Sequence, residues 1–190
     1  MEKRTELWGQ IEQFYTERYK GWSGSKQFEG TAARLERTME EMCWIPSRIG
    51  DELRKCFKSV YPDKYDEMLV TGPTSVWTLC PHHLVPVGMK VNIGYIPNGQ
   101  VLGLSKFSRV AIISGRRPIM QEQYTRDVAD TIMAHLNPQG VGVYVVGHHG
   151  CMGCRGVNQN ISVSTTTLRG NFKDEPSVKE EFYRMVEGNI

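Results

Sequence analysis

The hydrophobic pattern of the chain changes its period near residue 67, and this change limits the folds open to it. Before it, apolar residues recur at helical spacing in three stretches that end near Tyr19, Cys43 and Val60. After it, residues 87–95 alternate, and residues 141–146 form an apolar run typical of a buried strand. We therefore expect an α+β fold with an antiparallel sheet, helices on one face of that sheet and an N-terminal helical extension.

Turn and helix signals divide the second part further. Pro97, Asn98 and Gly99 predict an antiparallel hairpin between residues 87–95 and 101–104. The spacing also predicts a helix over residues 119–136, an exposed Thr-rich strand over 162–167 and a closing helix over 178–186. We expect one domain overall, with a helical region at residues 1–64 and a catalytic region at residues 65–190.

Size and charge exclude several classes of protein. A chain of 190 residues is long enough for one sizeable core. Its 23 Lys and Arg nearly balance its 21 Asp and Glu, so no global field indicates a nucleic acid or a membrane as partner. No apolar run is long enough to span a membrane and the N-terminus lacks the pattern of a signal peptide, so we expect a cytoplasmic protein.

Cysteine and histidine gather in two short segments, residues 80–83 and 148–154, each at the end of an expected strand. These segments hold four of the five histidines and three of the five cysteines. Thiolate and imidazole are zinc ligands, and two sites can be drawn. A closed, structural site would use Cys80, His83, Cys151 and Cys154. An open site would use only the first three and leave His82 and His149 beside the metal as acid or base; the presence of these histidines favours it.

Further motifs follow in a fixed order. They are Cys80, Pro81, His82, His83, Leu84, Val85 and Pro86; Tyr95, Ile96 and Pro97; Gly103, Leu104, Ser105, Lys106 and Arg109; Arg117 and Pro118; Gln121 and Glu122; His149, Gly150, Cys151 and Met152; and Arg155, Gly156 and Val157. In this order and spacing the chain resembles zinc-dependent GTP cyclohydrolase I, the type IA family, most strongly over residues 65–186. It departs from the family at Pro81, where the family usually has Glu, and at Cys154, which is not a ligand position there.

The resemblance implies a fold and an assembly. The fold is the tunnelling fold, in which antiparallel sheets of several subunits join into a barrel with helices outside. The subunits form a homo-oligomer, most often a decamer of two pentamers, with the active sites between subunits.

The resemblance also implies a reaction, in which GTP and water give 7,8-dihydroneopterin triphosphate and formate. Zn²⁺ on Cys80, His83 and Cys151 would supply a nucleophile for C8 of the guanine. His149 would protonate N7, and His82 would move protons during ring opening and ribose rearrangement. The product could serve pterin, tetrahydrofolate or 7-deazaguanine biosynthesis.

Substrate contacts are implied at two places. Ser105, Lys106, Arg109 and Arg155 would hold the triphosphate, and Gln121 and Glu122 would contact the base. The Glu122 carboxylate could accept hydrogen bonds from N1 and the 2-amino group of guanine. Alternatively, these two residues only begin a helix, where an acidic side chain favours the macrodipole.

Two other functions fit some of the same residues. A relative with the same fold, 7-cyano-7-deazaguanine reductase, uses a cysteine nucleophile with NADPH. A structural zinc module that binds a partner or nucleic acid would use the closed four-ligand site.

Overall fold

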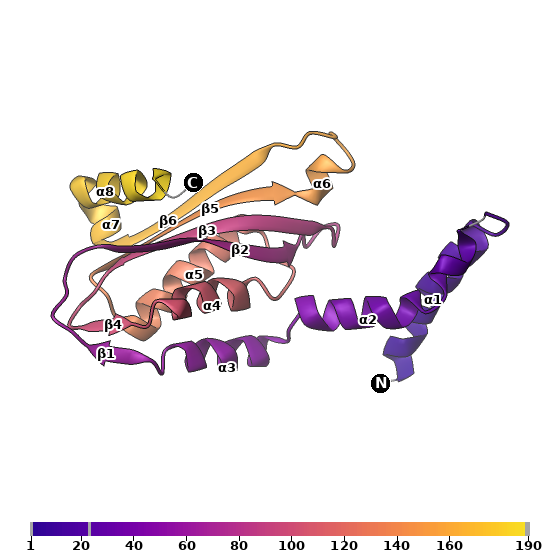
Figure 1. The fold of residues 1–190 in the computed structure, drawn as a ribbon, viewed down its shortest axis with the longest axis horizontal. Coiled ribbons are helices and arrows are strands. Elements are labelled where there is room, and N and C mark those ends of the chain that lie inside the picture. The colour runs from indigo at the N-terminus through magenta and orange to yellow at the C-terminus, as the bar shows by residue number, and fades with distance from the viewer. Residues whose placement is uncertain (1, 23, 189–190) are drawn as a thin grey trace. The chain divides into compact units, whose positions relative to one another are not determined.

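The computed structural model describes residues 2–22 and 24–188 (Figure 1). It divides into two compact units, Met1–Trp44 and Ile45–Ile190. The helices and strands are, in order, α1 (Glu2–Arg18), η1 (Ser25–Phe28), α2 (Thr31–Met42), α3 (Pro46–Cys56), β1 (Val60–Pro62), β2 (Leu69–Leu79), β3 (Pro86–Ile96), β4 (Gln100–Leu102), α4 (Ser105–Ser114), α5 (Gln121–Leu136), β5 (Gly140–His149), α6 (Gly150–Gly153), β6 (Ser162–Gly170), α7 (Asn171–Asp174) and α8 (Pro176–Glu187).

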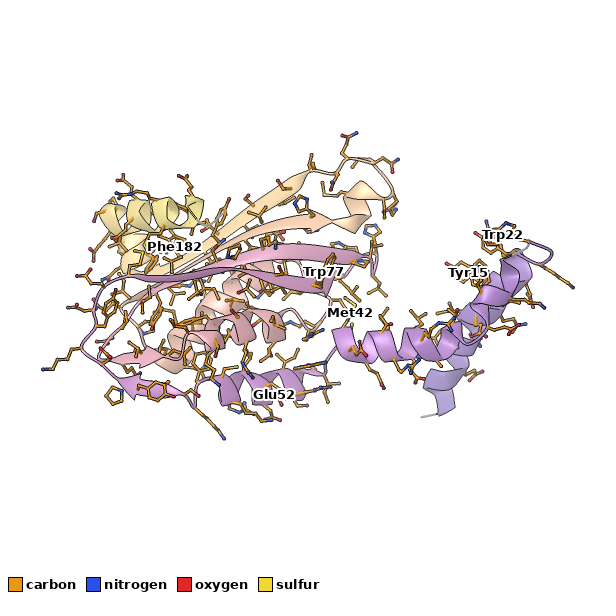
Figure 2. The ribbon with its side chains drawn as sticks, in the orientation of Figure 1. Tyr15, Trp22, Met42, Glu52, Trp77 and Phe182 are labelled. Atoms are coloured by element: carbon orange, nitrogen blue, oxygen red, sulfur yellow. The ribbon has the colours of Figure 1, made fainter. Side chains whose placement is uncertain are left out.

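The first unit is a pair of helices joined through the short helix η1. Helix α2 begins after Gly30 without a side-chain cap of its own, and Glu12 of α1 takes over that role. The Glu12 carboxylate accepts hydrogen bonds from the backbone N–H groups of Gly30 at 3.2 Å and Ala32 at 2.7 Å. Tyr15, labelled in Figure 2, stacks on Phe28 with ring centroids 5.9 Å apart. These contacts tie the two helices together.

The second unit is built on a four-stranded antiparallel sheet with the strand order β2-β3-β5-β6. The β2–β3 register runs from Leu69 opposite Tyr95 to Leu79 opposite Pro86. At the same end of the sheet, Val87 of β3 lies opposite His149 of β5. The two strands that end in the Cys and His segments are therefore separated only by β3.

Helices α4 and α5 cover one face of this sheet, as predicted, and the main core lies between them. Its members alternate along the strands, as a half-buried sheet requires. They are Val91, Ile93 and Tyr95 of β3, Val141, Val143 and Val145 of β5, Phe107 and Val110 of α4, and Val128 and Ile132 of α5, all at most 1% exposed. The α+β fold with an antiparallel sheet is confirmed.

The closing helix expected over residues 178–186 is confirmed as α8, but the expectation of helices on only one face of the sheet is wrong, because α7 and α8 form a second layer on the other face. They pack on one end of the opposite face, where Phe172 and Phe182 are fully buried (Figures 1 and 2). Gly94 and Gly142 make this packing possible, because a Cβ atom at either position would lie within 2.7 Å of a phenylalanine ring. The rest of that face stays uncovered within the described chain, and Trp77 on it is 62% exposed.

The expected hairpin between residues 87–95 and 101–104 is wrong. Strand β3 pairs on its two sides with β2 and β5, whereas β4 pairs with β1. The reason is that β3 is buried on both sides of its alternation near Tyr95, so it takes a central place and the turn at Gly99, with φ of 71°, leads into a separate two-stranded ribbon.

Helix α3 packs against α4 and belongs to the second unit, although it lies within the expected helical region of residues 1–64. The expected division into a helical region at residues 1–64 and a catalytic region at residues 65–190 stays a prediction. Over the residues that the structure describes, we find no helix that is both long and apolar enough to cross a membrane.

Candidate active site and metal centre

Cys80 lies directly after β2, in a tight loop that returns the chain to β3. Its backbone N–H donates to the Val85 carbonyl at 2.9 Å, and its carbonyl accepts from the Leu84 N–H at 2.8 Å. The preceding residue, Leu79, is held from the other side, because its carbonyl accepts a hydrogen bond from the Ile119 N–H at 3.1 Å. The thiol therefore starts from a backbone that is fixed on both sides.

Cys151 reaches the same place from the end of β5. Helix α6 begins directly after His149 and carries Cys151 in its first turn. Gly150 allows the close approach of this segment to the loop of Cys80, because a Cβ atom there would lie 2.6 Å from Val85 and 2.8 Å from the carbonyl oxygen of Pro86. A larger residue at position 150 would push Cys151 away from Cys80.

Three side chains gather at this point with the geometry of a metal site. The ligand atoms of Cys80, His83 and Cys151 all lie within 4.8 Å of one another. Cys80 Sγ and His83 Nδ1 are 3.6 Å apart, which is about the separation of a sulfur and a nitrogen on one tetrahedral zinc ion. Two thiols and one imidazole suit Zn²⁺, so the residues present fit the metal that the resemblance implies.

The surroundings of Cys151 favour its neutral thiol over the thiolate. Burial, together with the neighbouring Cys80 thiol, raises the pKa of Cys151. A bound cation would favour the thiolates and displace their protons.

Cys154, the fourth candidate ligand, lies outside this group. It is exposed, and its Sγ donates a hydrogen bond to the Gly150 carbonyl at 2.9 Å. Three protein ligands leave one tetrahedral position open, as in catalytic zinc sites. The geometry therefore favours the open arrangement of the two that the sequence allowed.

Both candidate acid–base histidines lie next to the cluster. His82 is exposed, with Nδ1 3.9 Å from Cys80 Sγ. His149 is partly buried, and its Nε2 lies 2.8 Å from Oε1 of Gln121. Burial lowers the pKa of His149, although the Glu122 carboxylate acts in the opposite direction. Burial therefore favours the neutral ring, which can accept a proton.

Gln121 and Glu122, the two residues expected to contact the guanine base, have different surroundings. Glu122 is exposed and lines a cavity of about 410 Å³ beside β6, together with Thr165 and Thr166. Gln121 is only 3% exposed, and both ends of its amide are already hydrogen-bonded inside the chain. Glu122 is thus accessible to a ligand, whereas Gln121 faces the protein.

The residues expected at the triphosphate do not lie together in one chain. Arg155 is close enough to Cys151 to act on its pKa. Ser105 and Lys106 begin α4, which follows β4 at the opposite end of the sheet from α6 (Figure 1). There the Leu102 N–H donates to the Tyr95 hydroxyl at 3.4 Å.

Arg109 belongs to this distant set. Ser108, its neighbour, contacts Thr74 of β2 at 3.0 Å, which is five residues before Leu79 and so about 17 Å along the strand from it. The charges of Lys106 and Arg109 act on Cys56 of α3, the helix packed against α4. One chain therefore brings the metal ligands and Arg155 together but keeps the other three phosphate candidates apart from them.

Sequence reasoning missed the helical start of the phosphate segment and the contact between Gln121 and His149. The apolar spacing of Phe107, Val110 and Ala111 is a signal that could have revealed α4. No local signal reveals the second contact, because the two residues are 28 positions apart.

Together, the α+β fold and the Cys and His cluster define the chain as a candidate metal-dependent hydrolase. A family model described as GTP cyclohydrolase I matches residues 22–187. The chain belongs to the GTP cyclohydrolase I family, and its subunit is that of a tunnelling fold. This membership supports neither the reductase nor the structural zinc module.

Individual relatives agree with the family model. The chain is 38% identical over 157 residues to GTP cyclohydrolase 1 of Clostridium perfringens strain 13, covering 82% of this chain and 83% of that protein. It is 42% identical over 129 residues to GTP cyclohydrolase 1 of Homo sapiens, covering 67% of this chain and 52% of the human protein. A solved structure of an archaeosine synthase QueF-like protein in the apo form aligns with a TM-score of 0.46 and 22% identity, over 57% of this chain and 96% of that one.

Proposed function

We propose that the chain catalyses the reaction of GTP with water to give 7,8-dihydroneopterin triphosphate and formate, with Zn²⁺ held by Cys80, His83 and Cys151. The observation that carries this proposal is the convergence of these three ligand atoms within 4.8 Å at the end of the sheet, beside His82 and His149, in a member of the GTP cyclohydrolase I family.

The difficult step is the addition of water to C8 of an aromatic purine. Zinc in this site would supply a water of lowered pKa, near 7, as the nucleophile. His149 has a neutral ring next to the cluster, so it can take a proton from the attacking water and deliver one to N7 as the ring opens. His82, exposed on the other side of Cys80, is placed to move protons in the later ring opening and ribose rearrangement.

Binding of the substrate would use residues of more than one chain. Glu122 would accept hydrogen bonds from N1 and the 2-amino group of guanine, with Arg155 near the metal ligands of the same chain. Because Ser105, Lys106 and Arg109 lie far along the sheet from Cys80, their triphosphate contacts would come from a neighbouring subunit.

An assembly with sites between subunits follows from this separation. In the described chain, β6 has no partner strand on its outer side, and β2 has only the bridge from Leu79 to Pro118 there. Joining these edges into a barrel would satisfy their free backbone groups. A decamer of two pentamers, as the resemblance implies, is the assembly that we propose. We further propose a cytoplasmic enzyme of pterin, tetrahydrofolate or 7-deazaguanine biosynthesis, with no nucleic-acid or membrane partner.

Pro81 is the departure that bears most directly on activity. It lies between Cys80 and His82 in an exposed turn, and its ring restricts the backbone there without removing a metal ligand or a proton donor. We therefore expect the reaction to proceed with proline at this position.

The test is to incubate purified, zinc-loaded protein with GTP carrying ¹³C at C8 and to follow the label by NMR. The proposal predicts labelled formate in equal amount to a pterin triphosphate. Release of no formate from GTP would refute it, and Pro81→Glu would then be the first variant to examine.

A further inference from the structure

Gln121 is surrounded by hydrogen-bond partners although it is a neighbour of the exposed Glu122. Its Nε2 lies 2.9 Å from the carbonyl oxygen of Val163 and 3.3 Å from that of Val145. On its other side, Oε1 lies 2.8 Å from Nε2 of His149. The side chain thus links both strands β5 and β6 to a histidine of the candidate site.

The direction of each hydrogen bond follows from the partners. A backbone carbonyl can only accept, so the NH₂ group of Gln121 must face Val145 and Val163. Its Oε1 then faces His149 and can only accept. The Nε2 of His149 must therefore carry a hydrogen and donate it.

A pair of threonines holds the amide in this orientation. The Thr125 hydroxyl donates to the Gln121 carbonyl at 2.7 Å, so it must accept the hydrogen of Thr165, whose Oγ1 is also 2.7 Å away. The oxygen of Thr165 is then left to accept from Nε2 of Gln121, at 3.1 Å. A flipped amide would place Oε1 against two carbonyls and lose these contacts.

The strand beneath the amide has no side chain at the point of contact. A Cβ atom at Gly147 would overlap Oε1 of Gln121 and lie 3.3 Å from Nε2 of His149. The contact between Gln121 and His149 therefore depends on glycine at position 147.

We propose that Gln121 is a positioning residue that holds His149 as its Nε2–H tautomer, so that Nδ1 is the nitrogen that exchanges protons with substrate and water. The inference rests on the proposed function for the role of His149. It gives Gln121 a role other than the contact with GTP that the sequence indicated, because both ends of its amide are used within the chain.

The kinetic test compares two substitutions of similar size. Gln121→Met keeps the volume but removes the acceptor, and we expect kcat for GTP to fall by about 10- to 100-fold while KM stays within about threefold, as for other supporting contacts of a site. Gln123→Met, on the exposed side of the same helix, is the matched control and should leave both constants unchanged.

Two kinetic outcomes would overturn the proposal. If Gln121→Met raises KM for GTP and leaves kcat unchanged, Gln121 contacts the substrate. If Gln121→Met lowers kcat no more than Gln123→Met does, the amide of Gln121 has no part in positioning His149.

A spectroscopic test is independent of turnover. In zinc-loaded protein with ¹⁵N-labelled histidine, the His149 signals are identified by their loss in His149→Asn. The proposal predicts a protonated Nε2 and an unprotonated Nδ1 in the wild type, and loss of this single tautomer in Gln121→Met. An Nδ1–H tautomer in the wild type, or an unchanged spectrum in Gln121→Met, would overturn it.

The wild-type spectrum decides the matter even if Gln121→Met does not fold. Failure of the wild type to release formate from GTP would contradict the proposed function, and the tautomer would still report on Gln121.

Discussion

Two inactive variants of this chain should restore activity to each other when they assemble together. One variant, Cys151→Ser, lacks a proposed metal ligand, and the other, Lys106→Met with Arg109→Met, lacks two of the proposed phosphate contacts. Cys80 follows the end of β2, and Thr74, which contacts the neighbour of Arg109, lies about 17 Å back along the strand. We therefore propose that a GTP with its base at the metal meets these phosphate contacts on a neighbouring chain, so that each site combines two chains.

The magnitude follows from counting the sites. In a random mixture of equal amounts, half of the metal clusters are intact, and half of these meet an intact phosphate segment on the neighbour. About one quarter of the sites therefore carry both parts, and activity should reach about 25% of the wild type.

The assay is formate release from GTP by co-expressed chains with different affinity tags, purified through both tags in succession. The matched control is Cys151→Ser with Cys80→Ser, a pair that damages the same part of the site and should remain inactive. Mixed oligomers of the first pair that show no more activity than the separate variants would refute the placement of the site between chains.

Three further predictions concern single residues. Cys154→Ser should keep about one zinc per chain by metal analysis and most activity, whereas Cys151→Ser should lose both; loss of zinc from Cys154→Ser would mean the closed four-ligand site. His149→Ala should keep its zinc but lower kcat by about 10²–10⁴-fold, the usual contribution of a general acid or base, and a wild-type rate would exclude that role. Glu122→Gln should lower kcat/KM for GTP and weaken the preference for GTP over ATP, since the amide replaces one charged acceptor oxygen with an NH₂ donor that would face a donor of guanine; an unchanged preference would leave Glu122 as a helix-start residue.

Much of the fold could be predicted from the sequence, because the spacing of apolar residues along the chain shows which side chains are buried in each strand and helix. The alternation at residues 87–95 and the apolar run at 141–146 predict strands β3 and β5 directly, since every second side chain of each faces α4 and α5. The spacing does not show which strands pair with each other. The turn at Gly99 is equally compatible with a hairpin and with the observed partner β1, and only the burial of β3 between two long strands decides between them.

The candidate site likewise has contacts that the sequence could predict and contacts that it could not. Cys80 and His83 are three residues apart and Cys151 closely follows a predicted strand, so residue type and spacing could predict a shared site for them. The contact of Gln121 with His149 depends on where α5 lies on the sheet and on the missing side chain of Gly147. Such a contact arises from packing, and no local pattern in the sequence encodes it.

The central claim is that metal held by Cys80, His83 and Cys151 drives the opening of GTP. It is tested most directly by removing the metal with a chelator and then measuring the rate of formate release as zinc is returned in steps. The account predicts no release from the metal-free protein and a linear rise that stops at about one zinc per chain. Formate release at the full rate without metal, or a rise that continues well beyond one zinc per chain, would contradict it.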